Sequence, residues 1–144
     1  MALALGEARA ALAHDDVPVG AIVLDPDGVE LARAHNRREE LGRVSAHAEI
    51  LAIEAACQRL GQGWRLDGCT MVVTLEPCPM CAGAIVQSRL ARLVFGAFDD
   101  KAGAVSSLWD LVRDPRLNHR MSVVAGVEAE ESSALLKAFF VNRR

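Results

Sequence analysis

Residues 70–81 read TMVVTLEPCPMC, and this stretch decides the fold. Its first six residues are β-branched or apolar, which predicts a buried strand over residues 70–75. Pro77 suits the start of a helix, so we expect a helix from residue 77 to about residue 89. In α/β sheets, ligands bind where a strand ends and the next helix begins. Candidate chemistry is therefore expected first at Cys78 and Cys81.

The flanking segments also alternate between strand and helix patterns. Two short apolar runs, 19–24 and 29–34, enclose the turn sequence DPDG and predict a β-hairpin. Further strands are expected over 93–98 and 122–127, and further helices over 4–14, 107–112 and 132–144, with one more opened by His47 and closed by Gly61. The Arg-rich segment 36–43 predicts a loop. This order predicts a single domain over residues 1–144, of the α/β class, with a central mixed sheet of about five strands in a three-layer α/β/α arrangement.

The composition excludes several classes of protein. The 144 residues are 51% hydrophobic and carry a formal net charge of -3, so no positive field covers the whole molecule and any site for a polyanion must be local. No uncharged apolar stretch approaches the roughly 20 residues that a membrane span requires. Four cysteines are too few for a disulfide scaffold, which favours a reducing cytoplasm and leaves thiols free to bind metal.

Three residues in two separate segments form a candidate metal site. Cys78 and Cys81 are three apart, so a helix would present both on one face, and the helix N-terminus favours their thiolate forms. With His47 they supply three nitrogen and sulfur ligands, the number that a catalytic zinc uses while a fourth position stays open for water. Glu49 follows His47 by two residues, and such a pair diverges on a regular helix. We therefore expect His47 at or just before the helix start and Glu49 in its first turn, as a proton shuttle.

Two other interpretations of the cysteines remain at this point. A structural zinc site would need a fourth ligand, either Cys57 or Cys69. Cys57 lies roughly 15 Å along the predicted helix from His47, which makes it a poor partner, whereas Cys69 is harder to exclude. A C-x-x-C pair at a strand-to-helix junction is also typical of thioredoxin-like redox proteins.

The combination of H-x-E with P-C-x-x-C is the signature of zinc deaminases that act on nucleobases. Beyond it, the segments VPVGA (17–21), AHAEI (46–50), TLEPCPMCAGA (74–84), NHR (118–120) and FFVNRR (139–144) resemble the bacterial tRNA-specific adenosine deaminases. This resemblance extends over nearly the whole chain. The first signature is shared by all cytidine-deaminase-like enzymes, whereas the later segments are similar to the tRNA enzymes in particular.

The resemblance implies a reaction and an assembly. One Zn²⁺ per subunit, held by His47, Cys78 and Cys81, would supply a hydroxide that attacks C6 of the wobble adenine at position 34 of an arginine tRNA anticodon. Glu49 would protonate N1 and then the leaving amine, which gives inosine and ammonia. The resemblance further implies a cytoplasmic homodimer in which both subunits shape the RNA site.

It also implies roles for residues that bind the anticodon. Val19 would line the base pocket, Asn36 would hydrogen-bond the flipped base, the backbone amide of Ala48 would face its edge, and Asp99 would lie toward the sugar. The RNA-binding candidates are Asn118, His119, Arg120, Phe139, Phe140, Arg143 and Arg144. Of the two rings, we expect one to pack in the core and one to stack on a base, beside arginines that contact phosphate. Arg37, Arg38 and Arg43 form a second basic cluster.

Two other functions compete with this interpretation. A deaminase of free bases or nucleosides, such as guanine, cytosine or cytidine, would share every catalytic residue but would not need the aromatic and basic C-terminal segment. A non-catalytic zinc or RNA-binding module would have no use for Glu49, a carboxylate that lies beside the metal without binding it. We therefore expect an enzyme that acts on tRNA.

Overall fold

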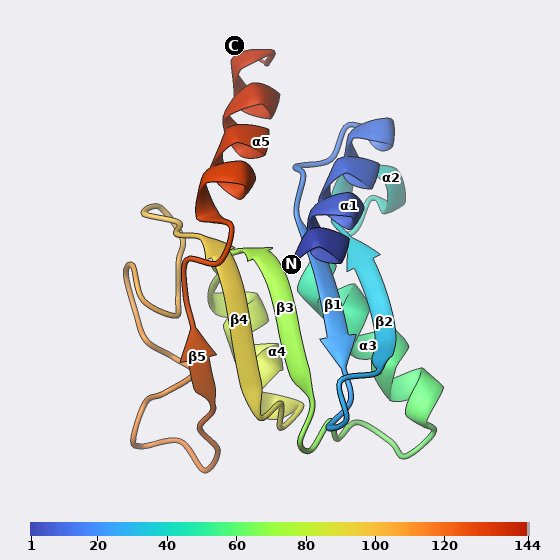
Figure 1. The fold of residues 1–144 in the computed structure, drawn as a ribbon, viewed down its shortest axis with the longest axis vertical. Helices are drawn as coiled ribbons and strands as arrows, with labels where there is room; N and C mark the ends of the chain where they lie inside the picture. The colour runs from blue at the N-terminus through green and yellow to red at the C-terminus, as the bar shows by residue number, and fades with distance from the viewer. Residues whose placement is uncertain (144) are drawn as a thin grey trace.

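The computed structural model describes residues 1–143 and contains one five-stranded mixed sheet between two layers of helices (Figure 1). In spatial order the strands are β2 (Glu30–His35), β1 (Gly20–Leu24), β3 (Thr70–Leu75), β4 (Arg92–Ala97) and β5 (Ser122–Val124). Strand β1 is antiparallel to both of its neighbours, whereas β3, β4 and β5 run parallel to one another. The predicted α/β class with its mixed sheet is confirmed. Among residues 1–143, no helix has the length and apolar character to span a bilayer.

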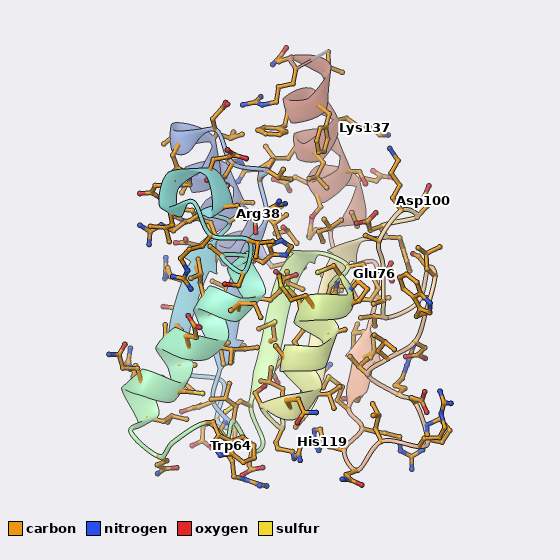
Figure 2. All side chains as sticks on the ribbon, turned by 180° about the vertical axis from the view of Figure 1, so that it is seen from behind. Arg38, Trp64, Glu76, Asp100, His119 and Lys137 are labelled. Atoms are coloured by element: carbon orange, nitrogen blue, oxygen red, sulfur yellow. The ribbon has the colours of Figure 1, made fainter. Side chains whose placement is uncertain are left out.

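Helices cover both faces of the sheet. Helices α3 (Ala48–Leu60) and α4 (Pro79–Gln87) lie together on one face of the sheet, which is turned toward the viewer in Figure 2. The main core lies beneath them, where Ala52, Ile85 and Phe95 are buried. On the other face, α1 (Ala2–Ala10) packs on β1 and α5 (Ala129–Val141) packs on the end of β4 (Figure 1). The prediction of three layers is thus also confirmed.

The contact between α1 and β1 depends on a glycine. A Cβ atom at Gly20 would lie 2.0 Å from the carbonyl oxygen of Ala4 and 2.6 Å from the amide nitrogen of Ala8. Real side chains do not tolerate such distances, so the helix can approach the strand this closely only because residue 20 has no side chain. After α1 the chain continues as a 3-10 turn (Ala11–His14) that leads back toward the sheet.

One helix prediction and one loop prediction need correction. The segment 107–112 is irregular, because the amide of Ser107 donates to the Glu76 side chain and those of Leu108 and Leu111 donate to the carbonyl groups of Gly103 and Ala104, five and seven residues earlier. These bonds replace the i to i−4 bonds of a helix. Within the predicted loop 36–43, the structure instead forms the short helix α2 (Arg38–Leu41), whose first amides donate to the buried carboxylate of Asp16.

The last strand and helix have different bounds from those expected. Strand β5 ends at Val124 and not at residue 127, because Gly126 (φ 80°) and Glu128 (φ 55°) turn the chain through the left-handed region. Helix α5 consequently begins at Ala129, three residues before the expected start at residue 132. The other predicted elements are present, with ends that differ by a few residues.

Candidate metal centre and catalytic pocket

The three candidate metal ligands meet where two helices begin. His47 is the N-cap of α3, Cys78 is the N-cap of α4, and Cys81 lies in the first turn of α4. His47 Nδ1 lies 3.7 Å from Cys78 Sγ and 3.4 Å from Cys81 Sγ. The expected place of His47, just before its helix, is confirmed. The carboxyl end of β3 therefore brings together residues that are 31 and 34 positions apart in the sequence.

These donors fit a zinc ion. Tetrahedral Zn–N and Zn–S bonds of about 2.0–2.3 Å place neighbouring ligand atoms about 3.3–3.8 Å apart, and the three atoms here all lie within 4.8 Å of one another. Among residues 1–143, neither Cys57 nor Cys69 belongs to this cluster. Cys69 precedes β3 at its far end, and Cys57 lies in the later part of α3. The set therefore has the three ligands of a catalytic zinc site and lacks the fourth of a structural site.

The local electrostatics favour the thiolate form of Cys78 but not that of Cys81, whereas both were expected to be favoured. A hydrogen bond from the Cys81 thiol lowers the pKa of Cys78 to about 4, against the opposing effect of burial, and His47 lowers it further. The same hydrogen bond, together with burial, raises the pKa of Cys81. The hydrogen bond with Cys78 also raises the pKa of His47. A negative charge thus resides at Cys78, at the N-terminus of α4, where a metal ion would be held.

Glu49 is a buried carboxyl group beside the ligands. Its exposed fraction is 4%, and burial raises the pKa of its carboxyl group. It does not belong to the cluster of three ligands, although it lines the same cavity. A carboxyl group with a raised pKa accepts and returns a proton more readily near neutral pH than an exposed one does. Glu49 is thus a buried carboxyl group beside the candidate ligands, and its role as a proton shuttle stays a prediction.

A small cavity of about 160 Å³, here called the metal cavity, opens at this point. It is lined by Val17, Val19, Asn36, Arg38, His47, Glu49, Leu75, Glu76, Cys78, Asp99 and Ala102. Three of the predicted base-binding residues, Val19, Asn36 and Asp99, are thus brought together with the metal ligands. Their individual roles toward a base stay predictions.

The amide groups of Asn36 and Ala48 are already paired with protein atoms. Ala48 N donates to Asn36 Oδ1 at 2.8 Å, and Asn36 Nδ2 donates to the carbonyl oxygen of Val17 at 3.1 Å. In this arrangement Asn36 fixes the start of α3, and with it the position of His47. A base that hydrogen-bonds Asn36 or Ala48 would have to share or displace these bonds.

Glu76 is a site residue that sequence reasoning missed. It is 1% exposed, and its carboxylate accepts backbone hydrogen bonds from Asp99, Val105, Ser106 and Ser107 as well as one from the Ser107 hydroxyl. Burial acts to raise the pKa of Glu76, but these hydrogen bonds outweigh it and lower the pKa. The carboxylate therefore holds the loop that carries Asp99 against the metal cavity. The sequence offered one signal for it, because Glu76 is a charged residue that directly follows the buried apolar strand β3 (Thr70–Leu75).

Replacing Glu76 with Gln is expected to destabilise the fold by about 1–3 kcal/mol, because part of this set of buried amides loses its acceptor. Since the folded-state pKa of Glu76 is lowered, its stabilising effect is complete above the unfolded-state pKa and disappears as the pH falls through the folded-state value. Urea unfolding of both proteins at neutral and acidic pH measures this, with the exposed Glu39→Gln on α2 as control. A stability difference that does not shrink in acid would contradict the assigned charge.

The C-terminal helix α5 borders a second cavity that lies next to the metal cavity. Phe139 is 5% exposed and packs in the core, whereas Phe140 is 50% exposed. That the Phe140 ring stacks on a base stays a prediction. Phe140 lines a second cavity of about 400 Å³, here called the Phe140 cavity, which shares Val17, Leu75 and Asp99 with the metal cavity. The Arg143 guanidinium lies 3.6 Å from the centre of the Phe139 ring and pairs with Asp15. Arg144 lies outside the described residues.

The predicted RNA-binding segment Asn118, His119 and Arg120 is not brought to this pocket within the chain. His119 Nε2 lies 2.6 Å from the carbonyl oxygen of Leu90, close to the start of β4. Figure 2 places His119 at one end of the sheet and Glu76 toward the other. The reason is topological, because β5 is parallel to β4 and the chain must return to the amino end of β4 to begin it.

Comparison with known proteins agrees with this geometry. Residues 1–97 match the family described as the cytidine and deoxycytidylate deaminase zinc-binding region. The chain is 51% identical over 137 residues to a tRNA-specific adenosine deaminase of Bacillus subtilis, which covers 95% of this chain and 84% of that protein. A similar relative from Aquifex aeolicus is 45% identical over 142 residues and covers 99% of this chain and 92% of its own length.

Two solved structures correspond to the two competing enzyme functions, and this chain can be compared with each. One, from work on A-to-I editing by tRNA:A34 deaminases at the wobble position of transfer RNA, superposes with a TM-score of 0.89 at 47% identity and covers 94% of this chain and 97% of that one. A guanine deaminase from Nitrosomonas europaea has a TM-score of 0.79 at 29% identity, with 97% and 82% covered. The fold is common to both, and the sequence of this chain is nearer to the first. The chain therefore belongs to the cytidine and deoxycytidylate deaminase family and, within it, to the tRNA-specific adenosine deaminases.

Proposed function

We propose that this protein catalyses the hydrolytic deamination of adenosine to inosine at wobble position 34 of a tRNA anticodon. The observation that carries the proposal is the set of three nitrogen and sulfur ligands with the buried, non-ligating carboxyl of Glu49 beside it. The similarity to tRNA-specific adenosine deaminases over nearly the whole chain supports the substrate.

The chemistry requires that water replace the amino group at C6 of adenine. A zinc ion held by His47, Cys78 and Cys81 would lower the pKa of a bound water toward neutrality. Glu49 accepts a proton from the water, delivers it to N1 of the base, and then transfers the second proton to the amino group, which leaves as ammonia. The proton balance closes, since adenosine and water give inosine and ammonia.

The substrate would be bound by the residues around the metal cavity. Val19 would present an apolar wall to the base, and Asp99 would face the sugar. Asn36 and the amide of Ala48 would bind the edge of the base by sharing or exchanging the hydrogen bonds that they make with protein atoms. Because the metal cavity measures only about 160 Å³, it suits a single base that has been flipped out of the anticodon loop. The neighbouring Phe140 cavity would take an adjacent base.

Replacing Phe140 with Ala is expected to raise KM for an anticodon stem-loop about 5- to 150-fold, because stacking on an aromatic ring is worth about 1–3 kcal/mol per base. The kcat at saturating substrate should change little, since Phe140 does not line the metal cavity. Steady-state inosine formation measures both constants. Val141→Ala removes a neighbouring exposed apolar side chain and is the matched control. An unchanged KM in Phe140→Ala would remove this ring from the RNA site.

The proposal includes a cytoplasmic homodimer that acts on an arginine tRNA. An apolar groove of about 610 Å³ on the outer face of α3 and α4, with the half-exposed Trp64 at its rim, supports the dimer. In a dimer, the segment 118–120 of a second copy would contact the RNA bound at the metal cavity of the first. Light scattering at micromolar concentration tests the dimer, and a mass of one chain would contradict it.

The deciding experiment measures deamination of a synthetic anticodon stem-loop with adenosine at position 34, beside free adenosine, cytidine and guanine, by zinc-loaded protein. Conversion of the stem-loop alone is the expected result. Conversion of a free base alone would overturn the proposed substrate while keeping the zinc chemistry. In that case the assignments of Phe139, Phe140 and Arg143 to RNA binding would be withdrawn.

A further inference from the structure

Two histidines outside the metal cavity lie against each other, one from the turn after α1 and one from the end of β2. His14 ends the 3-10 turn after α1, and His35 ends β2. Their ring centroids lie 5.1 Å apart, and the two Nε2 atoms are separated by 3.1 Å. Both side chains are about one-fifth exposed, and neither lines the metal cavity. The close approach of two identical ring nitrogens needs a physical explanation.

The opposite nitrogen of each ring is paired with a carboxylate. His14 Nδ1 lies 2.7 Å from Asp16 Oδ2, and His35 Nδ1 lies 2.7 Å from Glu7 Oε2. Burial acts to raise the pKa of Asp16, but hydrogen bonds from the Glu39 amide, His14 and the Glu40 amide lower it overall. An ionised carboxylate can only accept hydrogen bonds. The Nδ1 atoms therefore carry the protons.

The Nε2 atoms, on the opposite side of each ring from the carboxylates, consequently face one another at 3.1 Å, where two lone pairs would repel. Only a cation between or beside them removes this repulsion, and the candidates are a proton and a metal ion. Two ligands on a tetrahedral ion with Zn–N bonds of about 2.0–2.1 Å lie about 3.3 Å apart, close to the 3.1 Å observed. Histidines that ligate a metal through one nitrogen and donate from the other to a carboxylate are also the usual arrangement in metal sites.

The surroundings supply a nearby negative charge and access from solvent. Glu40 Oε2 lies 3.3 Å from His14 Nε2 and also accepts a hydrogen bond from Arg37. Among the described residues, only His47, Cys78 and Cys81 place three ligand atoms within 4.8 Å of one another, so this second site has two imidazoles at its centre and Glu40 at its edge. A cavity of about 410 Å³ borders both imidazoles and Glu40, which gives an ion and its water molecules a path from solvent.

We propose that His14 and His35 bind a divalent transition-metal ion, with water completing its coordination. Imidazole nitrogen selects ions such as Zn²⁺, Ni²⁺ and Cu²⁺ over Mg²⁺ and Ca²⁺. The ion would tie the turn after α1 to the end of β2. His35 directly precedes Asn36, so the bound ion would also brace the strand end that supports the metal cavity. This site is separate from the catalytic one and does not depend on the proposed reaction.

The test counts metal ions in the full-length protein. Zinc-loaded wild type, His14→Gln and His35→Gln are dialysed against micromolar Zn²⁺, and bound zinc is measured by elemental analysis. His119→Gln, which removes an imidazole elsewhere, is the matched control. Glutamine retains an N–H group for the neighbouring carboxylate, and circular dichroism checks that each variant is folded. We expect one more zinc per chain in wild type and in the control than in either variant.

A second measurement needs no variant. Cobalt added to wild type that carries one zinc per chain, at the cysteine site, should give d–d absorption without the thiolate charge-transfer bands of a cysteine site. It should also shift the ¹⁵N imidazole signals of His14 and His35. The proposal would be overturned if the wild type bound one metal ion per chain and cobalt did not affect these signals. A proton shared between the two rings would then explain their close approach. An extra metal retained in both His14→Gln and His35→Gln would overturn it as well.

Discussion

Replacing Glu49 with Gln is expected to lower the kcat for inosine formation by about 10²–10⁴-fold, while bound zinc and stem-loop affinity stay unchanged. The amide is nearly the same size as the carboxyl group, so it leaves the ligand cluster and the walls of the metal cavity in place. It cannot accept the proton of the attacking water or return it to the base. The effect should therefore fall on the chemical step.

Single-turnover inosine formation, elemental analysis and fluorescence anisotropy with a labelled stem-loop separate these quantities for Glu49→Gln. Glu39→Gln on α2 removes an exposed carboxyl group that lines neither the metal cavity nor the Phe140 cavity, and it serves as control. If Glu49→Gln kept most of the wild-type kcat, the proton shuttle would have to be another group. If instead it lost zinc, Glu49 would be a ligand, contrary to its place outside the cluster.

Replacing His47 with Ala is expected to remove the catalytic zinc and to lower activity by more than about 10⁴-fold, since no other group lowers the pKa of the water. Two sulfur ligands remain, but the nitrogen that lies 3.4 Å and 3.7 Å from them is lost. Loss of the ion should also lower the melting temperature, because a metal that binds only the folded chain stabilises it.

Zinc content after dialysis against zinc-free buffer, activity and thermal unfolding are the measurements for His47→Ala. The substitution is best made in a His35→Gln background, so that an ion held by the histidine pair does not mask the loss. His119→Ala deletes an imidazole far from the cluster and is the control for zinc content. Full zinc retention in the double variant would contradict the assignment of His47 as a ligand.

The metal ligands were predictable because their geometry is local. Cys78 and Cys81 share the start of one helix, and the spacing of His47 and Glu49 already required that the histidine precede its helix. The strand pattern of residues 70–75 indicated where this helix start would lie in the sheet. Resemblance then supplied the substrate, which the spacing of the ligands does not specify.

Other parts of the site could not be found this way, because they depend on contacts between distant segments. Glu76 binds amides 23 to 31 residues away, and those bonds replaced the helix expected over 107–112. The segment 118–120 matched the RNA-binding pattern, but the parallel pairing of β5 with β4 carried it to the other end of the sheet. Periodicity describes neighbours along the chain and contains no information on such pairings.

By itself, the sequence determined the α/β class, the two helix starts that carry the zinc ligands, and the carboxyl group beside them, since each follows from spacing within one strand or helix. Only the tertiary structure decided that Glu76 holds the Asp99 loop, that Phe140 borders the catalytic pocket while Phe139 is buried, and that His14 meets His35. The physical reason is that burial and side-chain pairing are properties of the packed sheet and its two helix layers, which bring together residues that the chain keeps apart.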